Sequence, residues 1–326
     1  MKVLVTGATG FVGRALVDRL LKERWRVAAL VRRGSNFEGL KRKGVKLFFG
    51  DVSNPDSVKG AVKGVDIIVN SAAALPYHNL PDKKYWEANV YGVKNVIQAA
   101  KISGIKRLVH ISTVGIYGAT SRRGASERSK TELSGVYSRT KFEGEKIVWK
   151  YIKEGFPATI IRPTIAYGPG DIRPGFLNLF VFIKKGMFVP VGKGDNFFHT
   201  IYVGNLVDAL MLAATKDAAI GEDFIIGDDP CPTMKELVEV IAKVQGKRLP
   251  NFYLPRWIAF ASGIFFDFIN KAGLPVPLTT KRVKFITENK KFKINKAKKV
   301  LGYKPRVGLE QGVRATRDWY RERGYL

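Results

Sequence analysis

The sequence predicts an α/β fold in which helices cover both faces of a doubly wound parallel sheet. Strand-like and helix-like patterns alternate through the first half of the 326-residue chain, and such alternation indicates parallel strands joined by helices. A short apolar segment, MKVLVT, leads directly into a glycine-spaced turn and then into a helical pattern. The chain is also long enough to bury a large core.

The first strand and the first helix are the clearest elements. Residues 3–5 have the β-branched character of a buried parallel strand, and residues 11–21 carry apolar side chains at helical spacing without proline. Further buried strands are expected at 26–31, 46–50, 66–73, 107–113 and 158–164. Helices are expected at 85–103 and 137–154, so the segments alternate as a doubly wound sheet requires.

The pattern becomes irregular and rich in turns after Gly168. We expect residues 199–203 and a helix from Asn205 to return to the sheet, followed by a short strand at 223–227. The first domain would then comprise residues 1–168 and 198–228. Residues 169–197 and 229–326 would form most of a smaller domain that binds the substrate, so the two domains interleave in sequence.

The chain is strongly basic, with 56 Lys and Arg residues against 28 Asp and Glu residues and a formal net charge of +28. Between Lys281 and Arg306 there are eleven basic residues and a single acid, Glu288. The remaining excess is dispersed, which is typical of a solvated basic surface and not of a nucleic-acid interface. Nucleic acid is therefore not an expected partner.

Few residues are available for disulfides or metal ligation. Cys231 is the only cysteine, which excludes an internal disulfide, and the three histidines lie in separate segments. We expect no bound metal. No segment reaches the roughly eighteen apolar residues that a membrane span needs, and the first strand leads at once into its turn, so we expect a cytoplasmic protein without a cleaved signal.

The turn between the first strand and the first helix is suited to bind phosphate. A helix N-terminus presents unpaired N–H groups and partial positive charge, and glycines let a pyrophosphate approach the backbone. Gly7, Gly10 and Gly13 occupy those positions. The strand, turn and helix context therefore predicts a dinucleotide-binding site.

The sequence motif of this turn, TGxxGxxG within MKVLVTGATGFVG, resembles that of the extended branch of the short-chain dehydrogenase/reductase superfamily. This branch includes NAD-dependent epimerases and dehydratases. The resemblance implies a Rossmann fold. It also implies that Thr9, Phe11 and Val12 bind the cofactor together with the three glycines.

Tyr137 and Lys141 are four residues apart in a helical stretch, so their side chains lie on one face. A phenol titrates near pH ~10, and an adjacent ammonium group stabilises the phenolate. One such pair is expected by chance in this chain. Its position is informative, because the helix follows a strand that ends in Ser112 and Thr113, where a parallel sheet opens its active site.

The resemblance assigns roles to these residues. Tyr137 would be the general acid or base on the substrate oxygen, Thr113 would hydrogen-bond that oxygen, and Lys141 would also hold the nicotinamide ribose. Asn89 matches an asparagine that supports the site through backbone and water contacts, and this role is favoured over the alternative of a polar residue that only belongs to a helix.

The end of the second strand indicates the choice of cofactor. An acid there would accept the ribose hydroxyls of NAD, whereas an arginine suits the 2′-phosphate of NADP. The chain has Arg32 and Arg33, which favours NADP(H) and leaves NAD(H) possible. Other cofactor contacts implied by the resemblance are Asp51 and Val52 beside the adenine, Ala72 and Ala73 under the cofactor, and Pro163, Thr164 and Ile165 beside the nicotinamide.

The residue at position 198 helps to distinguish between two branches of the superfamily. Nucleotide-sugar epimerases usually carry an arginine there that binds the sugar-nucleotide diphosphate, whereas this chain has Phe198. Gly192, Gly194, Asn205 and the pair at 202–203 instead resemble the 3β-hydroxysteroid and sterol dehydrogenases.

The stretch WIAFASGIFFDFI, at 257–269, is apolar and has basic residues on both sides. It could lie on a membrane surface, line an apolar substrate site, or form a buried helix or a dimer contact. The basic neighbourhood favours anionic lipid.

Our leading hypothesis is an NADP(H)-preferring oxidoreductase that interconverts a secondary alcohol and a ketone on a bulky apolar substrate such as a sterol, a hopanoid or a long-chain ketone. A nucleotide-sugar epimerase or dehydratase with tightly bound NAD is the second hypothesis, and a non-catalytic NADP-binding module is the third. A homodimer is expected from the resemblance, and membrane association through 257–269 stays open.

Overall fold

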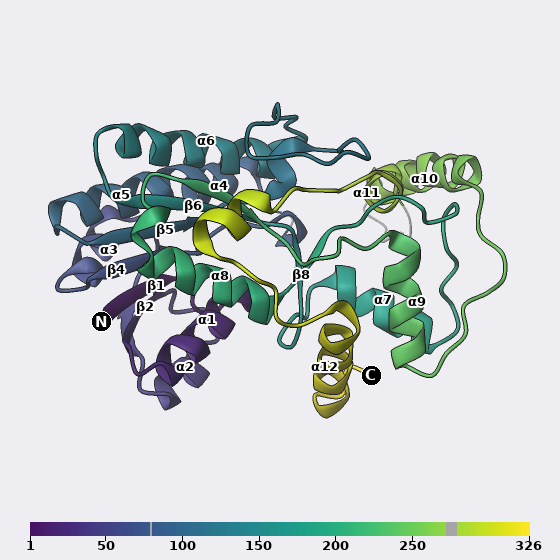
Figure 1. Cartoon of the computed structure of the whole chain (residues 1–326), viewed down its shortest axis with the longest axis horizontal. Coiled ribbons are helices and arrows are strands. Elements are labelled where there is room, and N and C mark those ends of the chain that lie inside the picture. The colour runs from purple at the N-terminus through teal and green to yellow at the C-terminus, as the bar shows by residue number, and fades with distance from the viewer. Residues whose placement is uncertain (79, 272–278) are drawn as a thin grey trace.

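The structure is a computed structural model that describes residues 1–78, 80–271 and 279–326. Its larger part is a seven-stranded sheet with the order β3-β2-β1-β4-β5-β6-β9, and every neighbouring pair is parallel (Figure 1). The strands are β1 (Lys2–Thr6), β2 (Arg26–Val31), β3 (Lys46–Phe49), β4 (Ile67–Asn70), β5 (Arg107–Ile111), β6 (Ala158–Pro163) and β9 (Asp223–Ile226). Because β1 lies between β2 and β4, the winding direction reverses there, and ligands bind at such a reversal.

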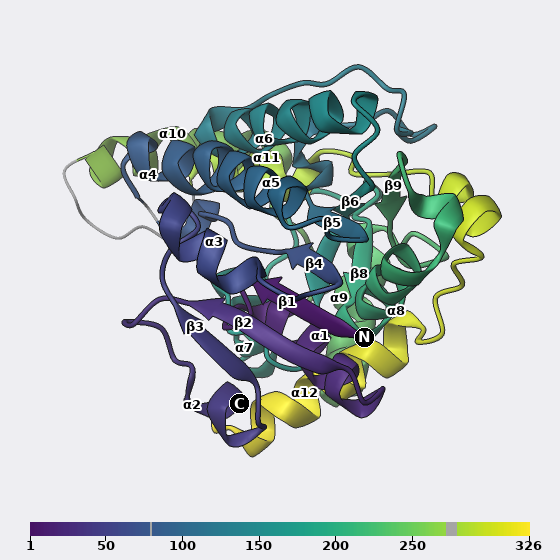
Figure 2. The same cartoon turned by 90° about the vertical axis from the view of Figure 1, so that its left-hand side faces the viewer.

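Helices cover both faces of this sheet (Figure 2). One face carries α1 (Phe11–Lys22), α2 (Glu38–Arg42) and α8 (Val203–Thr215). The other carries α3 (Pro55–Val62), α4 (Asp82–Trp86), a π-helical turn (Glu87–Tyr91), α5 (Gly92–Ile102) and α6 (Gly135–Lys153). The predicted doubly wound α/β fold is confirmed.

The central strands are mostly apolar because both of their faces are buried. Val3 and Val5 of β1 pack in the core on the α1 side, whereas Leu4 packs in the core on the α3 and α5 side. Successive side chains of a strand point to opposite faces, so a strand covered on both sides is a continuous apolar run.

Among the residues that the structure describes, the smaller part contains a two-stranded parallel sheet, β7 (Ile165–Tyr167) with β8 (Thr200–Tyr202), and five helices. Of these, α7 (Pro174–Lys184), α9 (Met234–Val244) and α12 (Leu309–Glu322) share one apolar core, and α10 (Arg256–Lys271) packs against α11 (Thr280–Thr287). Short helical turns lie at Pro76–His78, Val114–Tyr117, Asp217–Ala219 and Ala297–Leu301.

One strand assignment was wrong. Residues 199–203 were expected to rejoin the main sheet, but β8 pairs with β7, outside the seven-stranded sheet. The chain leaves the main sheet after β6, and the strand that starts two residues later, β7, provides the partner for β8. The return to the main sheet is made by β9, which pairs with β6, and by α8, which packs against α1.

Two further features bear on function. Within the described residues, no helix is both long enough and apolar enough to cross a membrane. Over the same residues, no cluster of three or more His, Cys, Asp or Glu side chains is placed to hold a metal ion.

Candidate active site

In the turn from β1 into α1, backbone segments lie so close together that only glycine fits at two positions, Gly7 and Gly13. Gly7 has φ +68°, and a Cβ built on it would lie 2.7 Å from the carbonyl carbon of Ser71. A Cβ on Gly13 would lie 2.2 Å from the carbonyl oxygen of Gly7. Gly10 precedes α1 without a side-chain hydrogen bond that would cap the helix, so the first turn of α1 offers its N–H groups to a ligand.

The turn opens into a cleft of about 960 Å³ at the carboxyl ends of the central strands. Most of the residues that the sequence assigned to the site line this cleft: Gly7, Thr9, Gly10, Phe11, Val12, Gly13, Arg32, Asp51, Val52, Ala72, Ala73, Thr113, Tyr137, Lys141, Pro163, Thr164 and Ile165. They come from the ends of six neighbouring strands, β1 to β6, and from two helices, α1 and α6, so the fold brings together residues that are far apart in sequence.

Two assigned residues do not line the cleft. The guanidinium of Arg33 lies over the ring of Phe49, at 5.2 Å, whereas its neighbour Arg32 faces the cleft. Asn89 is fully buried in the π-helical turn. Its amide accepts a hydrogen bond from the N–H of Ala74 (2.9 Å) and donates to Thr140 of α6 (3.0 Å). Asn89 therefore ties the segment after β4 to the helix that carries Tyr137.

Thr113 and Tyr137 stand together at the nicotinamide end predicted for the cleft. Thr113 Oγ1 accepts a hydrogen bond from the N–H of Gly115 (3.0 Å), and the Thr113 side chain also bonds that of Tyr137. Burial raises the pKa of Tyr137 to about 12, and the Thr113 side chain and the Arg173 guanidinium oppose that rise. At neutral pH the phenol of the cofactor-free protein is therefore protonated.

Lys141 lies one turn further along α6, and its side chain is buried. Its Nζ donates to the carbonyl oxygen of Ile111 at the end of β5 (2.7 Å). Burial lowers the pKa of Lys141 to about 8, and the carboxylate of Glu145 opposes this. The ammonium group is thus present at neutral pH, where it is available to a cofactor hydroxyl.

A second cation near Tyr137 was missed. Arg173 lies in the same cleft, with its guanidinium 4.7 Å from the centre of the Phe11 ring. Its Nε and Nη2 donate to the two oxygens of Asp171 (2.6 and 2.8 Å). In the sequence Arg173 belongs to the segment GPGDIRPG, whose glycines and prolines predict turns. An arginine in such a segment does not by itself indicate a functional site.

Other cleft residues also escaped the sequence analysis. Ser35 and Asn36 follow Arg32 closely in the chain, and Tyr77, His78, Leu80 and Pro81 also line the cleft. Residues 32–35 form a turn in which the N–H of Ser35 donates a hydrogen bond to the carbonyl oxygen of Arg32 (3.0 Å). These residues are in loops without periodicity, so nothing in the pattern distinguished them from surface.

A buried ionic network holds the strand end that carries Thr113. Arg162 of β6 donates from Nε to both carboxylate oxygens of Glu145, at 3.0 Å each, and also bonds Asp223 of β9. Glu145 in turn accepts a hydrogen bond from Ser112 Oγ. The network links β5, β6, β9 and α6, which fixes Thr113 relative to Tyr137.

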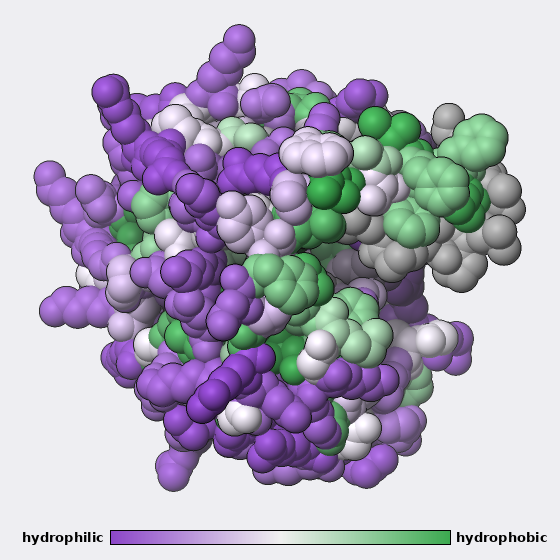
Figure 3. All heavy atoms as spheres, turned by 90° about the vertical axis from the view of Figure 1, so that its right-hand side faces the viewer, coloured by the Kyte–Doolittle hydropathy of each residue, from purple (hydrophilic) through white to green (hydrophobic). Residues whose placement is uncertain are grey.

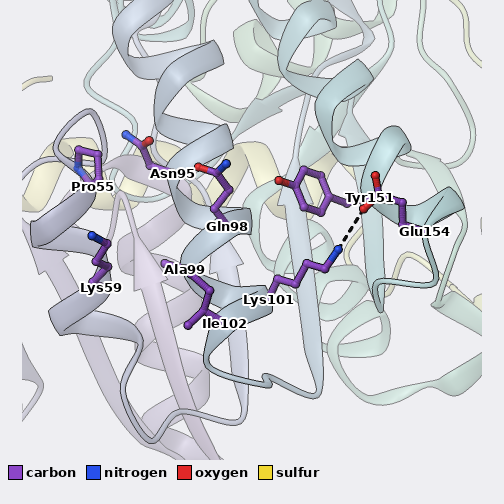
Figure 4. Close-up of a pocket in the computed structure, with 9 residues that line it drawn as sticks. All are labelled: Pro55, Lys59, Asn95, Gln98, Ala99, Lys101, Ile102, Tyr151 and Glu154. Carbon is purple, nitrogen blue, oxygen red and sulfur yellow. Dashed lines mark hydrogen bonds and ion pairs between the residues drawn. The ribbon is translucent and has the colours of Figure 1, made fainter.

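A second hollow, of about 380 Å³, lies on the outside of α3, α5 and α6 (Figure 4). Lys101 and Glu154 form an ion pair across it (3.0 Å), and Lys101 also lies 5.3 Å from the centre of the Tyr151 ring. The paired charges leave no free reactive group, and none of the assigned site residues line this hollow.

The fold and the main cleft are typical of a dinucleotide-binding enzyme. The glycine turn, the hydroxyl pair at Thr113 and Tyr137, and the buried ammonium of Lys141 all face one space. The model of the NAD-dependent epimerase/dehydratase family matches residues 3–227, and the chain belongs to this family.

Relatives and solved structures place the chain among extended short-chain dehydrogenase/reductases. It is 32% identical to a sterol-4-alpha-carboxylate 3-dehydrogenase (decarboxylating) of Candida albicans, across 98% of this chain and 97% of that protein. It is 28% identical to an undecaprenol-linked N-acetylglucosamine 4-epimerase of Escherichia coli O157:H7, across 96% and 93%. The crystal structure of gox2253 superposes with a TM-score of 0.83 at 28% identity, covering 99% of both chains.

Proposed function

We propose that the protein is an NADP(H)-preferring oxidoreductase that interconverts a secondary alcohol and a ketone on a bulky, largely apolar substrate. The observation that carries the proposal is the shared cleft: the hydroxyls of Thr113 and Tyr137 face the same space as the glycine turn. A binding module would need the turn, but it would need neither hydroxyl.

The residues present fit a nicotinamide dinucleotide. The glycine cradle is too narrow for a Cβ, the N-terminus of α1 has no side-chain cap, and the cleft continues from there to Lys141. The turn would hold the diphosphate, Asp51 and Val52 the adenosine, and Lys141 the nicotinamide ribose. The cofactor, when bound, supplies the hydride acceptor or donor.

The protein's own part in the reaction is to position and protonate the substrate oxygen. Thr113 would donate its hydroxyl proton in a hydrogen bond to this oxygen. Tyr137, protonated because burial raises its pKa, would give its proton to the oxygen as a ketone becomes an alcohol. In the reverse direction the phenolate is the base, and the cations of Lys141 and Arg173 stabilise it.

An apolar substrate is supported by three observations. Leu75, Leu80 and Pro81 line the cleft. Phe198, where epimerases of this superfamily usually carry an arginine, is buried and packs edge-on to Phe285, with ring centres 5.6 Å apart. Dehydrogenases acting on sterol carboxylates are among the most similar relatives, in Candida albicans and in Saccharomyces cerevisiae.

The epimerases among the relatives support a second candidate function, that of a nucleotide-sugar 4-epimerase. A 4-epimerase would retain its NAD and return the hydride to the same substrate, so it would produce no net oxidation or reduction. We expect the purified protein to consume NADPH with steroid ketones or long-chain β-keto acids, followed by absorbance at 340 nm. Tight NAD in the purified protein, interconversion of UDP-sugars and no net NADPH consumption would establish the epimerase instead.

Cofactor preference is expected to depend on Arg32 more than on Arg33. Only Arg32 faces the cleft, beside Ser35 and Asn36, whereas Arg33 stacks on Phe49. Replacing Arg32 by alanine removes a charged hydrogen-bond donor to the 2′-phosphate and should weaken NADPH binding about tenfold or more, with NADH nearly unaffected. The matched variant Arg33→Ala should change the ratio of the two dissociation constants much less, and equal effects in both variants would contradict this assignment.

A further inference from the structure

The outward face of α10 carries large apolar side chains in contact with solvent. Trp257, Ile264, Phe265 and Phe268 have exposed fractions of 73, 66, 63 and 77%. Residues at spacings of seven and four along a helix share a face, so Trp257, Ile264 and Phe268 form a stripe with Phe265 at its edge. We call these four residues the α10 face.

The α10 face is exposed although the helix is well packed on its other side. Ala259 is fully buried, and a Cβ on Gly263 would lie 2.9 Å from the N–H nitrogen of Thr280 in α11. The carboxylate of Asp267 accepts hydrogen bonds from Thr280. Small and polar residues therefore attach α10 to α11, and the aromatic residues are directed away from the protein.

The exposed apolar surface extends beyond α10. The segment before the helix pairs with the loop after α7, because the N–H of Leu254 donates to the carbonyl oxygen of Pro190 (2.8 Å). The pairing is parallel and sets Leu254 opposite Val191, and Phe252, Tyr253 and Met187 of these two segments are 64, 46 and 64% exposed. Figure 3 shows hydrophobic residues gathered on this side of the molecule among hydrophilic ones.

The sequence around α10 is mostly basic, and of its cations Arg256 is paired with Asp195 (3.3 Å). From Lys247 to Thr287 the sequence has seven Lys and Arg residues and one acid, Asp267, whose carboxylate is already bonded to Thr280. Lys281 and Lys284 are exposed on α11, next to α10. An aromatic stripe with basic neighbours is typical of a helix that lies in a membrane interface, and the basic groups attract anionic lipid headgroups.

We propose that the α10 face docks on an anionic membrane surface. A second copy of the chain fits this face less well, because a two-fold contact would bring the basic rims of both copies together. In the membrane, Trp257, Phe265 and Phe268 would enter the acyl boundary while the lysines of α11 contact headgroups. The proposal does not depend on which substrate the cleft binds.

Vesicle sedimentation with the full-length protein tests the proposal. We expect the wild type to bind vesicles of phosphatidylcholine and phosphatidylglycerol in equal amounts, to bind pure phosphatidylcholine much less, and to dissociate at high ionic strength. The triple variant Trp257→Ser, Phe265→Ser, Phe268→Ser should lose binding by about tenfold or more. As a matched control, Ile102→Ser, at an 82% exposed position on α5, should bind as the wild type does.

Two further measurements separate the possible occupants. Lys281→Glu with Lys284→Glu should weaken binding to the anionic vesicles and leave the reduction of a water-soluble ketone unchanged. Equal vesicle binding by the wild type and the triple serine variant would overturn the proposal. So would a wild-type dimer, seen by sedimentation velocity, that the triple variant abolishes while neither protein binds vesicles.

Discussion

Tyr137→Phe is expected to lower the turnover number by about 10³-fold while the affinity for NADPH stays nearly the same. The variant removes the phenolic proton that Tyr137 would give to the substrate oxygen. General acid catalysis of this kind contributes roughly 10²–10⁴-fold to the rate. The ring itself remains, so the packing around the cofactor is preserved. Steady-state reduction of a ketone and fluorescence titration with NADPH measure the two quantities.

The same substitution further along α6 serves as the control. Tyr151→Phe removes a hydroxyl from the helix on the outer surface, where Tyr151 lies beside Lys101 and far from the cleft. It should leave turnover unchanged. Wild-type turnover in Tyr137→Phe would show that another group moves the proton.

Gly13→Ala is expected to abolish cofactor binding at concentrations that saturate the wild type. The new Cβ would lie 2.2 Å from the carbonyl oxygen of Gly7 and 2.8 Å from the Cα of Ala8, and both are backbone atoms that no side-chain rotation can move away. The turn must shift, and the shift displaces the backbone N–H groups that would bind the diphosphate. Isothermal titration with NADPH measures the dissociation constant.

A glycine with free space around it provides the comparison. Gly60 lies in α3, and a Cβ there meets nothing within 4 Å. Gly60→Ala should bind NADPH as the wild type does and should unfold at a slightly higher temperature, because alanine restricts the unfolded chain more than glycine does. Unchanged NADPH affinity in Gly13→Ala would contradict the assignment of the turn to the diphosphate.

The sequence predicted the main sheet because burial on both faces produces a strong pattern. The strand expected at 26–31 is β2, with the same bounds, and the helix expected from Tyr137 to Glu154 is α6, which starts two residues earlier. The segment 199–203 has the same apolar character, but a three-residue strand does not specify its partner. Its pairing depends on β7, which the sequence pattern did not show.

The site residues that the sequence identified are those whose spacing carries chemistry, such as the glycines of the turn and the pair Tyr137 and Lys141. Arg173 could not be identified, because its proximity to Tyr137 arises from the return of the chain after β7. Arg32 and Arg33 were indistinguishable in sequence. The structure separates them because successive residues at the end of a strand point in opposite directions, and only Arg32 faces the cleft.

Transfer of a labelled hydride tests the central claim most directly. The wild type would be incubated with NADPH that carries two deuterium atoms at C4 of the nicotinamide and with a steroid or long-chain ketone, and the product would be analysed by mass spectrometry. We predict one deuterium on the carbinol carbon for each NADPH consumed, and formation of this product about 10³-fold more slowly with Tyr137→Phe. Unlabelled product, or interconversion of UDP-sugars without loss of the label from the cofactor, would contradict the account.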